Sequence, residues 1–252
     1  MGKNANTFRK RLTDGKPMMG TFIKTPSAIV AEVLALSDLD VIAIDAEHAP
    51  FDRLELDACI AALRAADKPS LVRLSDGSPT EIRNALDSGA TGIVVPHVTS
   101  AEQAEAIVKA TRFGDGGRGY AGSPRAADYT TKSMADHIAA TADQTTVIVQ
   151  IEDLAALDNV AQIAAVDGVD CLFIGRADLA VGMQKAVLDK EVVGTVKDIC
   201  AAGQNAGTAV GMFTPDLNEL PGWRKLGASL FLLSSDQSML LAGANELAQS
   251  IR

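Results

Sequence analysis

Two carboxylates follow apolar runs in the second half of the chain. Glu152 comes directly after TVIVQI, and Asp178 comes three residues after CLFIG. If these runs are neighbouring parallel strands, their carboxyl ends meet at one rim and bring the two side chains together. Carboxylate oxygens are the ligands that Mg²⁺ and Mn²⁺ prefer, and Co²⁺ also accepts them. The pair therefore predicts a divalent-metal site, where a bound cation would polarise the carbonyl group of a 2-oxo acid.

Three further charged groups lie near the ends of other apolar runs. Asp45 and His48 close the segment VIAIDAEH, and Arg73 closes SLVR. Arg73 offers donors to a carboxylate or to a developing enolate oxygen. Histidine suits proton transfer near neutral pH, and Asp45 can orient the ring of His48. Singly, Glu152 and Asp178 also fit helix N-caps or first-turn acids. His48 alone fits a loop histidine, and Arg73 alone fits a rim salt bridge, but together these groups favour an enolate-forming site.

Four other polar or aromatic residues are weaker candidates. Phe213 ends the run TAVGMF and fits a pocket wall and ordinary packing equally well. Asp87 lies late in an amphipathic run, where the helix dipole disfavours an acid, so it fits a supporting polar residue. His97 follows GIVVP, and His137 lies in a long polar connection, where we expect it at the surface.

The chain alternates eight times between short apolar runs and longer amphipathic ones. The short runs are continuously apolar, which is typical of parallel strands covered on both faces: PMMGTFI, VIAIDA, SLVRL, GIVVP, TVIVQI, CLFIG, TAVGMF and SLFLLS. The longer runs have the apolar period of helices, and Gly89, Gly203 and Gly227 are placed to end three of them. Eight such units predict an α/β fold of one domain, a TIM (β/α)₈ barrel over residues 1–252.

An open, doubly wound sheet is the alternative arrangement of the same units. Its nucleotide-binding forms carry GxGxxG after the first strand or GxxxxGK[ST], and the sequence contains neither pattern at the required place. The closed barrel is therefore the favoured prediction. One connection, from residue 112 to 145, is long enough to be functional or to carry a small helix.

Composition narrows the class of partner. The net charge is −9 and the pI is near 4.8, so we expect no basic face for nucleic acid. No stretch approaches roughly 18 uncharged apolar residues, and no apolar stretch of signal-peptide type follows the basic start, so we expect no membrane association and a cytoplasmic location. Cys59, Cys171 and Cys200 share no CxxC spacing and are expected to be buried free thiols.

These motifs are similar to those of the HpcH/HpaI aldolase family, the metal-dependent (class II) pyruvate aldolases. The resemblance rests on VIAIDAEHAPFD, LVRLSDGSPTEIRNALDSGATGIVVPHV, ATRFGDGGRGYA, VIVQIED and VDCLFIGRADLA, which span nearly the whole chain in the family's order. The EHAP and IGxADL segments are quite specific, whereas QIE alone is weak. The resemblance implies a carbon–carbon lyase that forms or cleaves 4-hydroxy-2-oxo acids from pyruvate or hydroxypyruvate and an aldehyde, such as a 4-hydroxy-2-oxo-heptane-dioate or 2-dehydro-3-deoxyglucarate aldolase.

The resemblance also implies roles for individual residues. Glu152 of QIED and Asp178 of GRADLA match the metal ligands of the family. Arg73 of LVRLS matches the residue that contacts the pyruvyl oxygen and stabilises the enolate. His48 of DAEHAP matches the residue implicated in base chemistry through a water molecule, and Asp45 lies beside it in the same motif.

Further matches concern the substrate and a neighbouring subunit. The backbone amides around Gly175, Ala177 and Asp178 match those that receive the pyruvate carboxylate. Asp87 of ALDSG matches a supporting acid that an adjacent subunit can contribute, and Arg118 of GGRG matches a loop arginine. The resemblance implies a homo-oligomer, a hexamer built as a trimer of dimers, with C-terminal helices exchanged between subunits.

The chain departs from the family pattern beside the expected pocket. Arg176 and Ala180 stand where some members have the Pro and Ser of GPADLS, and His97 follows a proline that often precedes an apolar residue. These positions bear on the aldehyde acceptor rather than on the enolate chemistry. A Schiff-base mechanism is disfavoured, because Lys24 is the one lysine candidate at a strand end and has no supporting constellation.

Two alternative functions remain open from the sequence. A related lyase of the citryl- or malyl-CoA type would need an acyl-CoA site, for which no extended basic groove is apparent. A non-catalytic barrel that binds a 2-oxo acid would not need Glu152, Asp178, Arg73 and His48 together.

Overall fold

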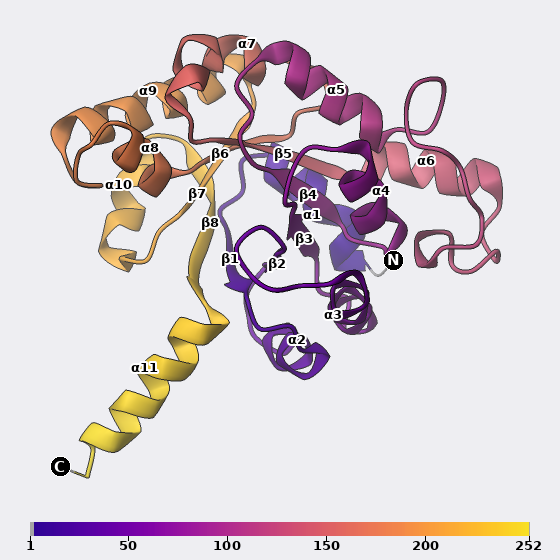
Figure 1. Ribbon diagram of the computed structural model, residues 1–252, viewed down its shortest axis with the longest axis horizontal. Coiled ribbons are helices and arrows are strands. Elements are labelled where there is room, and N and C mark those ends of the chain that lie inside the picture. The colour runs from indigo at the N-terminus through magenta and orange to yellow at the C-terminus, as the bar shows by residue number, and fades with distance from the viewer. Residues whose placement is uncertain (1–2, 252) are drawn as a thin grey trace.

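The computed structural model describes residues 3–251 and contains eight parallel strands in a closed barrel (Figure 1). The strands are β1 (Met18–Ile23), β2 (Val41–Asp45), β3 (Ser70–Arg73), β4 (Gly92–Val95), β5 (Thr146–Ile151), β6 (Cys171–Ile174), β7 (Ala209–Phe213) and β8 (Ala228–Ser235). Each strand pairs with the next along the chain, and β8 pairs with β1. The predicted TIM (β/α)₈ barrel is therefore confirmed, and the open sheet is excluded.

Helices follow the strands and form the outer layer. They are α1 (Lys3–Thr13), α2 (Ala28–Ala35), α3 (Arg53–Ala65), α4 (Pro79–Asp87), α5 (Ala101–Thr111), α6 (Met134–Gln144), α7 (Val160–Ala164), α8 (Arg176–Gly182), α9 (Lys190–Ala206), α10 (Leu220–Lys225) and α11 (Asp236–Gln249), with 3₁₀ turns η1 (Arg125–Ala127), η2 (Leu154–Asn159) and η3 (Leu217–Glu219). Among the described residues, no helix combines the length and the apolarity that crossing a bilayer requires.

Glycines mark two of the three predicted helix ends. Gly89 and Gly227 lie just past α4 and α10 with φ of 94° and 87°, a backbone conformation that glycine adopts without strain. The prediction for Gly203 is wrong, because α9 runs through it and ends before Gly207. A Cβ at Gly203 would lie 2.4 Å from Cγ2 of Val210 in β7, so this glycine lets helix and strand approach closely.

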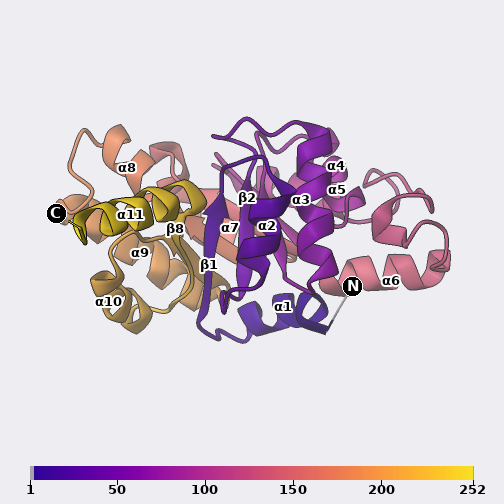
Figure 2. The same cartoon turned by 90° about the horizontal axis from the view of Figure 1, so that it is seen from below.

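The helix α1 was not predicted, and it closes one end of the barrel. It lies across the end where the strands begin (Figure 2). Phe8 and Leu12, one turn apart on α1, are fully buried against interior barrel residues that include Met18 and Leu230. Arg9 of the same helix donates from Nε to Oδ1 of Asp170 at 2.9 Å. With this end closed, the opposite rim is the open end of the barrel.

The helix α11 leaves the barrel after β8 and projects away from it (Figure 1). Of its residues, only Asp236 at the first position is buried. Leu240 and Leu241 are each 65% exposed and Leu247 is 71% exposed. In a closed barrel each helix ordinarily buries an apolar stripe, so α11 lacks its packing surface within this chain.

The long connection is ordered around a small aromatic cluster. It contains η1 and α6. Phe113 packs edge-on against the ring of His137 with a centroid separation of 5.1 Å, and Tyr120 packs at a tilt with a separation of 5.8 Å. His137 is 2% exposed, so the prediction of a surface residue is wrong. Aromatic residues within the connection bury the histidine. The prediction relied on the overall polar composition of the connection and did not account for these aromatic residues. The three cysteines are free and buried, as predicted.

Candidate active site at the carboxyl ends of the strands

Asp45 and Arg73 form the fixed centre of the open rim. They end the paired strands β2 and β3 and lie in register. Arg73 donates from Nε to Oδ1 of Asp45 at 3.0 Å and from Nη2 to Oδ2 at 2.8 Å. Burial by itself would raise the pKa of the Asp45 carboxyl, but hydrogen bonds from Arg73 and Lys24 outweigh it and lower that pKa. The carboxylate therefore stays ionised and fixes the guanidinium.

Lys24 and His48 complete the surroundings of this carboxylate. Nζ of Lys24 lies 3.0 Å from Oδ2 of Asp45, so the lysine is engaged in an ion pair. The backbone N–H of His48 donates to Oδ1 at 3.1 Å. Asp45 thus contacts the backbone of His48 rather than orienting its ring, which is 58% exposed. The His48 ring remains open to a substrate that enters from solvent.

Glu152 directly follows β5 and is 4% exposed. Its Oε1 accepts the backbone N–H of His97 at 2.9 Å, and its Oε2 accepts from Nε2 of Gln150. Burial nevertheless raises the pKa of the Glu152 carboxyl, and the negative charge of Asp178 adds to this. A Cβ at Gly175 would lie 2.7 Å from Oε2, so the glycine makes room for the carboxylate. A nearby cation would stabilise the ionised form of this buried group.

Asp178 lies in the first turn of α8, directly after β6, and is exposed. Because its charge acts on Glu152, the two predicted carboxylates share one part of the rim. The backbone N–H of Gly175 donates to the carbonyl of Ile151 at 3.0 Å. This amide is therefore taken by β5, and of the three predicted amide positions, Ala177 and Asp178 are left for a substrate carboxylate.

The structure also brings Glu47 and His97 to Glu152. One ligand atom from each of these three residues lies within 4.8 Å of the others. Nδ1 of His97 is 3.4 Å from Oε1 of Glu152, and Nε2 is 3.6 Å from Oε1 of Glu47. The other oxygen of Glu47, Oε2, faces Nε of Arg73 at 3.3 Å. Glu47 was not among the predicted site residues, because its contacts join β2 to β4 and β5 across the mouth of the barrel.

Asp153 holds the ring of His97 in this position. Nδ1 of His97 lies 3.0 Å from Oδ2 of Asp153. Burial lowers the pKa of the His97 ring, but the hydrogen bond to Asp153 and the charges of Glu152 and Glu47 outweigh burial and raise that pKa. The ring is 60% exposed, so it lies at the surface of the mouth rather than in the core.

An aromatic pair lies beside Arg73. The guanidinium carbon of Arg73 lies 4.7 Å from the ring centroid of Phe22, a cation–π contact. The ring of Phe22 is in turn 6.1 Å from that of Phe213. Phe213 is 37% exposed, so it packs on one side and borders the open rim on the other. Phe213 therefore combines the two roles expected from the sequence, packing against a neighbouring side chain and bordering the mouth of the barrel.

Asp87 and Arg118 contact each other but lie apart from this group. Nη2 of Arg118 is 3.5 Å from Oδ1 of Asp87, and the guanidinium stacks 4.2 Å from the ring centroid of Phe113. Burial raises the pKa of the Asp87 carboxyl, although Arg118 opposes the shift. Asp87 is the last residue of α4, a helix that runs back toward the end of the barrel closed by α1.

Comparison with known proteins identifies the family. The model of the HpcH/HpaI aldolase/citrate lyase family matches residues 18–242, from β1 into α11. The chain belongs to this family. The hydroxypyruvate/pyruvate aldolase of Roseovarius nubinhibens is 35% identical to it over 243 residues, which cover 96% of this chain and 95% of that protein. The 4-hydroxy-2-oxo-heptane-1,7-dioate aldolase of Klebsiella pneumoniae is 34% identical over 245 residues, which cover 96% and 92%.

The family is equally clear from solved structures. A crystal structure of an HpcH/HpaI aldolase/citrate lyase family protein from Burkholderia cenocepacia matches with a TM-score of 0.92 and 35% identity, over 98% of this chain and 99% of that one. The family resemblance inferred from the EHAP and IGxADL segments is thereby confirmed. Membership makes this chain an aldolase-type lyase, an enzyme that acts on small molecules.

Proposed function

We propose that this enzyme is a divalent-metal-dependent aldolase. It forms or cleaves 4-hydroxy-2-oxo acids, with pyruvate or hydroxypyruvate as donor and an aldehyde as acceptor. The observation that carries the proposal is the presence on one rim of a buried carboxylate with a raised pKa, Glu152, and a guanidinium fixed by a buried carboxylate, Arg73. A cationic centre and an anchored donor are what an enolate requires for stabilisation.

The residues around Glu152 fit a divalent cation. Glu152 and Asp178 are the proposed ligands, and both present the oxygen atoms that Mg²⁺ and Mn²⁺ prefer, while Co²⁺ also suits them. Oε1 of Gln150 is buried without a hydrogen-bond partner among residues 3–251, which leaves an acceptor unsatisfied beside Glu152. When bound, the cation supplies Lewis-acid polarisation of the 2-oxo group and lowers the barrier to removing the neighbouring C3 proton.

Arg73 is the proposed donor to the enolate oxygen. Its Nε and Nη2 are held by Asp45, and its Nη1 has no hydrogen-bond acceptor within the described part of the chain. A guanidinium carries five N–H donors, so Nη1 keeps two for a substrate oxygen. Because Asp45 fixes the plane of the group, little side-chain entropy is lost when the substrate binds.

His48 is the proposed proton acceptor for C3, acting through a water molecule. Its ring is exposed at the rim, while its backbone is held by Asp45. The amides of Ala177 and Asp178 receive the substrate carboxylate, and Phe213 lines the mouth on the other side. Lys24 stays ion-paired to Asp45, which supports a mechanism without a Schiff base.

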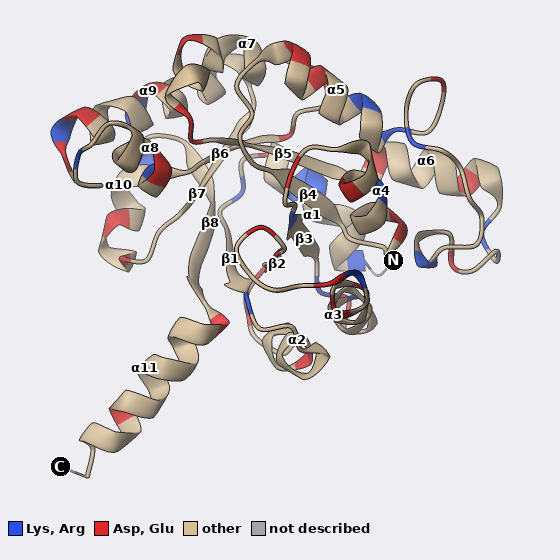
Figure 3. Cartoon of the chain, viewed as in Figure 1, with Lys and Arg blue, Asp and Glu red and all other residues tan. Residues whose placement is uncertain are grey.

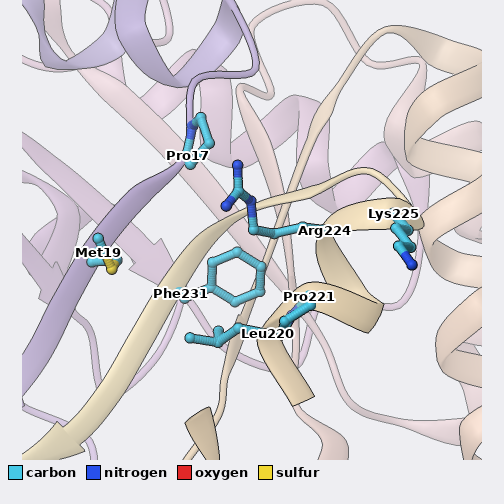
Figure 4. A pocket seen from close by; sticks show the side chains of 7 residues that line it. All are labelled: Pro17, Met19, Leu220, Pro221, Arg224, Lys225 and Phe231. Carbon is cyan, nitrogen blue, oxygen red and sulfur yellow. The ribbon is translucent and has the colours of Figure 1, made fainter. Parts of the chain in front are cut away.

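The assembly we propose is a hexamer, a trimer of dimers with α11 exchanged between subunits. Figure 3 shows α11 as mostly uncharged, and its only charged residues are two acids, Asp236 and Glu246. A cavity of about 450 Å³ on the outer face of β1 and β8 is bordered by Met19, Phe231 and Leu220 (Figure 4). This is the face that the helix after the last strand covers in a closed barrel, and a partner's α11 supplies the apolar surface for it.

The same assembly gives Asp87 a supporting role in a neighbouring site. Asp87 lies away from the rim of its own barrel, and its side chain is 22% exposed, whereas the side chain of Arg118 beside it is only 2% exposed. Cytoplasmic location and the absence of nucleic-acid partners remain predictions from composition.

The experiment that tests this function is an aldol-addition assay with direct detection of the product. Pyruvate or hydroxypyruvate is incubated with a panel of aldehydes, enzyme and Mg²⁺ or Mn²⁺, and the 4-hydroxy-2-oxo acid is detected by mass spectrometry. We expect product with the native enzyme and none with Glu152→Gln or after chelation by EDTA. Product formation that is unchanged in both conditions would contradict the proposed site.

A further inference from the structure

His97 has a backbone conformation that few non-glycine residues adopt. Its φ is +56°, in the left-handed region, and Pro96 precedes it. The conformation places the backbone N–H on Oε1 of Glu152 at 2.9 Å and turns the imidazole ring toward the same residue. Backbone conformations of this kind persist where the surroundings enforce them, often at binding sites. The proposed aldol chemistry assigns no role to this ring.

The contacts of the ring leave one nitrogen free to act as a ligand. Oδ2 of Asp153 lies 3.0 Å from Nδ1, and a carboxylate only accepts, so Nδ1 carries the hydrogen of that bond. In the neutral tautomer the lone pair then lies on Nε2. Histidines that bind metals in proteins are commonly held this way, with the other ring nitrogen donating to a carboxylate.

The free nitrogen faces the carboxylate of Glu47. Nε2 is 3.6 Å from Oε1 of Glu47, a separation that two ligands of one cation can have. The Glu47 side chain is only 9% exposed. Its buried Oε2 has no hydrogen-bond partner among residues 3–251, but it lies 3.3 Å from Nε of Arg73 and 3.6 Å from Nε2 of His48. Arg73 balances the charge on the Oε2 side of this carboxylate, which leaves Oε1, on the side of His97, as the oxygen available to a bound cation.

We propose that Nε2 of His97 is a nitrogen ligand of the site's cation, together with carboxylate oxygens of Glu47 and Glu152. The inference rests on the proposed function, because it adds His97 and Glu47 to a metal site that includes Glu152. An imidazole ligand raises the affinity for Mn²⁺, Co²⁺ and Zn²⁺ relative to Mg²⁺, which prefers oxygen. This site therefore selects transition metals, and Asp153 is a positioning residue that orients the ring.

The test reads the metal's ligands directly. The full-length enzyme is loaded with Mn²⁺, and pulsed electron paramagnetic resonance records nitrogen hyperfine coupling to the bound ion. The chain contains three histidines, of which His137 is buried among aromatic rings. His48→Gln is therefore the matched control for His97→Gln. We expect coupling in the native enzyme and in His48→Gln, and its loss in His97→Gln.

Affinities give an independent readout. Titration with Mn²⁺ and Mg²⁺ should show a Kd for Mn²⁺ that is about 10- to 100-fold higher in His97→Gln, and about 10-fold higher in Asp153→Asn, with little change for Mg²⁺. Absence of coupling in native enzyme mixed with Mn²⁺, or coupling that persists in His97→Gln, would overturn the inference. If that native sample still catalyses metal-dependent aldol formation, the proposed function stands and only the role of His97 fails.

Discussion

The guanidinium of Arg73 donates two hydrogen bonds to the buried carboxylate of Asp45, from Nε to Oδ1 at 3.0 Å and from Nη2 to Oδ2 at 2.8 Å. Both residues end neighbouring strands, so the barrel itself sets their relative position. The pair turns the remaining nitrogen of Arg73 into an oriented donor at the open rim. We infer that enolate stabilisation depends on that orientation as much as on the positive charge.

Replacing Arg73 by Lys should therefore remove activity without removing charge. An ammonium group cannot grip Asp45 with two parallel bonds and still present donors to the substrate. We expect kcat/KM for aldol formation to fall about 100-fold or more, the cost of losing an oriented donor. Arg83→Lys, on the exposed side of α4, is the matched control and should leave kcat/KM unchanged. Equal activity in the two variants would rule out an oriented role for Arg73.

The lowered pKa of Asp45 predicts how stability depends on pH. A carboxyl whose pKa is lower in the folded state stabilises the fold above its unfolded pKa, near 3.8, and this stabilisation is lost as pH falls through the folded value. Asp45→Asn should lower the free energy of unfolding by about 3 kcal/mol at pH 7, because Arg73 and Lys24 lose a buried partner.

Urea denaturation at several pH values measures this effect. The difference in the free energy of unfolding between native enzyme and Asp45→Asn should be constant above about pH 5 and should narrow as pH falls below the unfolded aspartate pKa near 3.8. Asp115→Asn, in an exposed turn, is the control and should show little difference at any pH. A difference for Asp45→Asn that does not narrow in acid would mean that Asp45 acts through packing rather than charge.

Replacing His48 by Gln should separate binding from proton transfer. The backbone N–H that Asp45 accepts is retained in this variant, so the loop after β2 keeps its anchor. We expect the rate of C3 proton removal to fall about 100- to 10,000-fold. Pyruvate affinity, measured by calorimetry with Mg²⁺ present, should change only a few-fold. A normal rate of proton removal would exclude His48 as the base.

Charges on α11 should break the proposed assembly. Leu240 and Leu241 are largely exposed in the single chain, and the double change Leu240→Glu and Leu241→Glu places two charges on the surface proposed to pack on a partner. We expect a smaller species in light scattering coupled to gel filtration. Lys197→Glu changes the net charge by the same amount on an exposed position of α9 and should leave the mass unaltered. If the native enzyme is already monomeric, the proposal that α11 is exchanged between subunits is wrong.

The eight repeated strand–helix units could be predicted from the sequence, whereas features outside this repeat, such as the helix α1, could not. Strands such as β5 are continuous apolar runs, so their number and the closed barrel follow from pattern alone. The helix α1 could not be predicted because its three buried residues, Ala5, Phe8 and Leu12, lie in a stretch that is otherwise polar and basic. Gly203 was wrongly predicted to end a helix. The reason for a glycine there is the close approach of α9 to Val210 in β7, which becomes apparent only in the folded chain.

The same distinction applies to the site. Residues such as Arg73 and Glu152 directly end or follow strands, so the rule that barrel sites lie at the carboxyl ends of strands finds them. Glu47 and Asp153 lie beside predicted site residues in the sequence, but their contacts with His97 cross from β2 and β5 to the loop after β4. A sequence does not specify how far loops lean over a barrel mouth, so these contacts could not be predicted.

Proton NMR of pyruvate in D₂O with enzyme and Mg²⁺ tests the proposed metal-dependent enolate chemistry directly. It detects enolate formation before any aldehyde is known. We predict that the methyl signal is lost through exchange with deuterium, that EDTA stops the loss, and that Glu152→Gln does not support it. Exchange that survives EDTA would contradict the metal site. A folded enzyme that binds pyruvate but exchanges no methyl protons with Mg²⁺ or Mn²⁺ would contradict the proposed enolate chemistry.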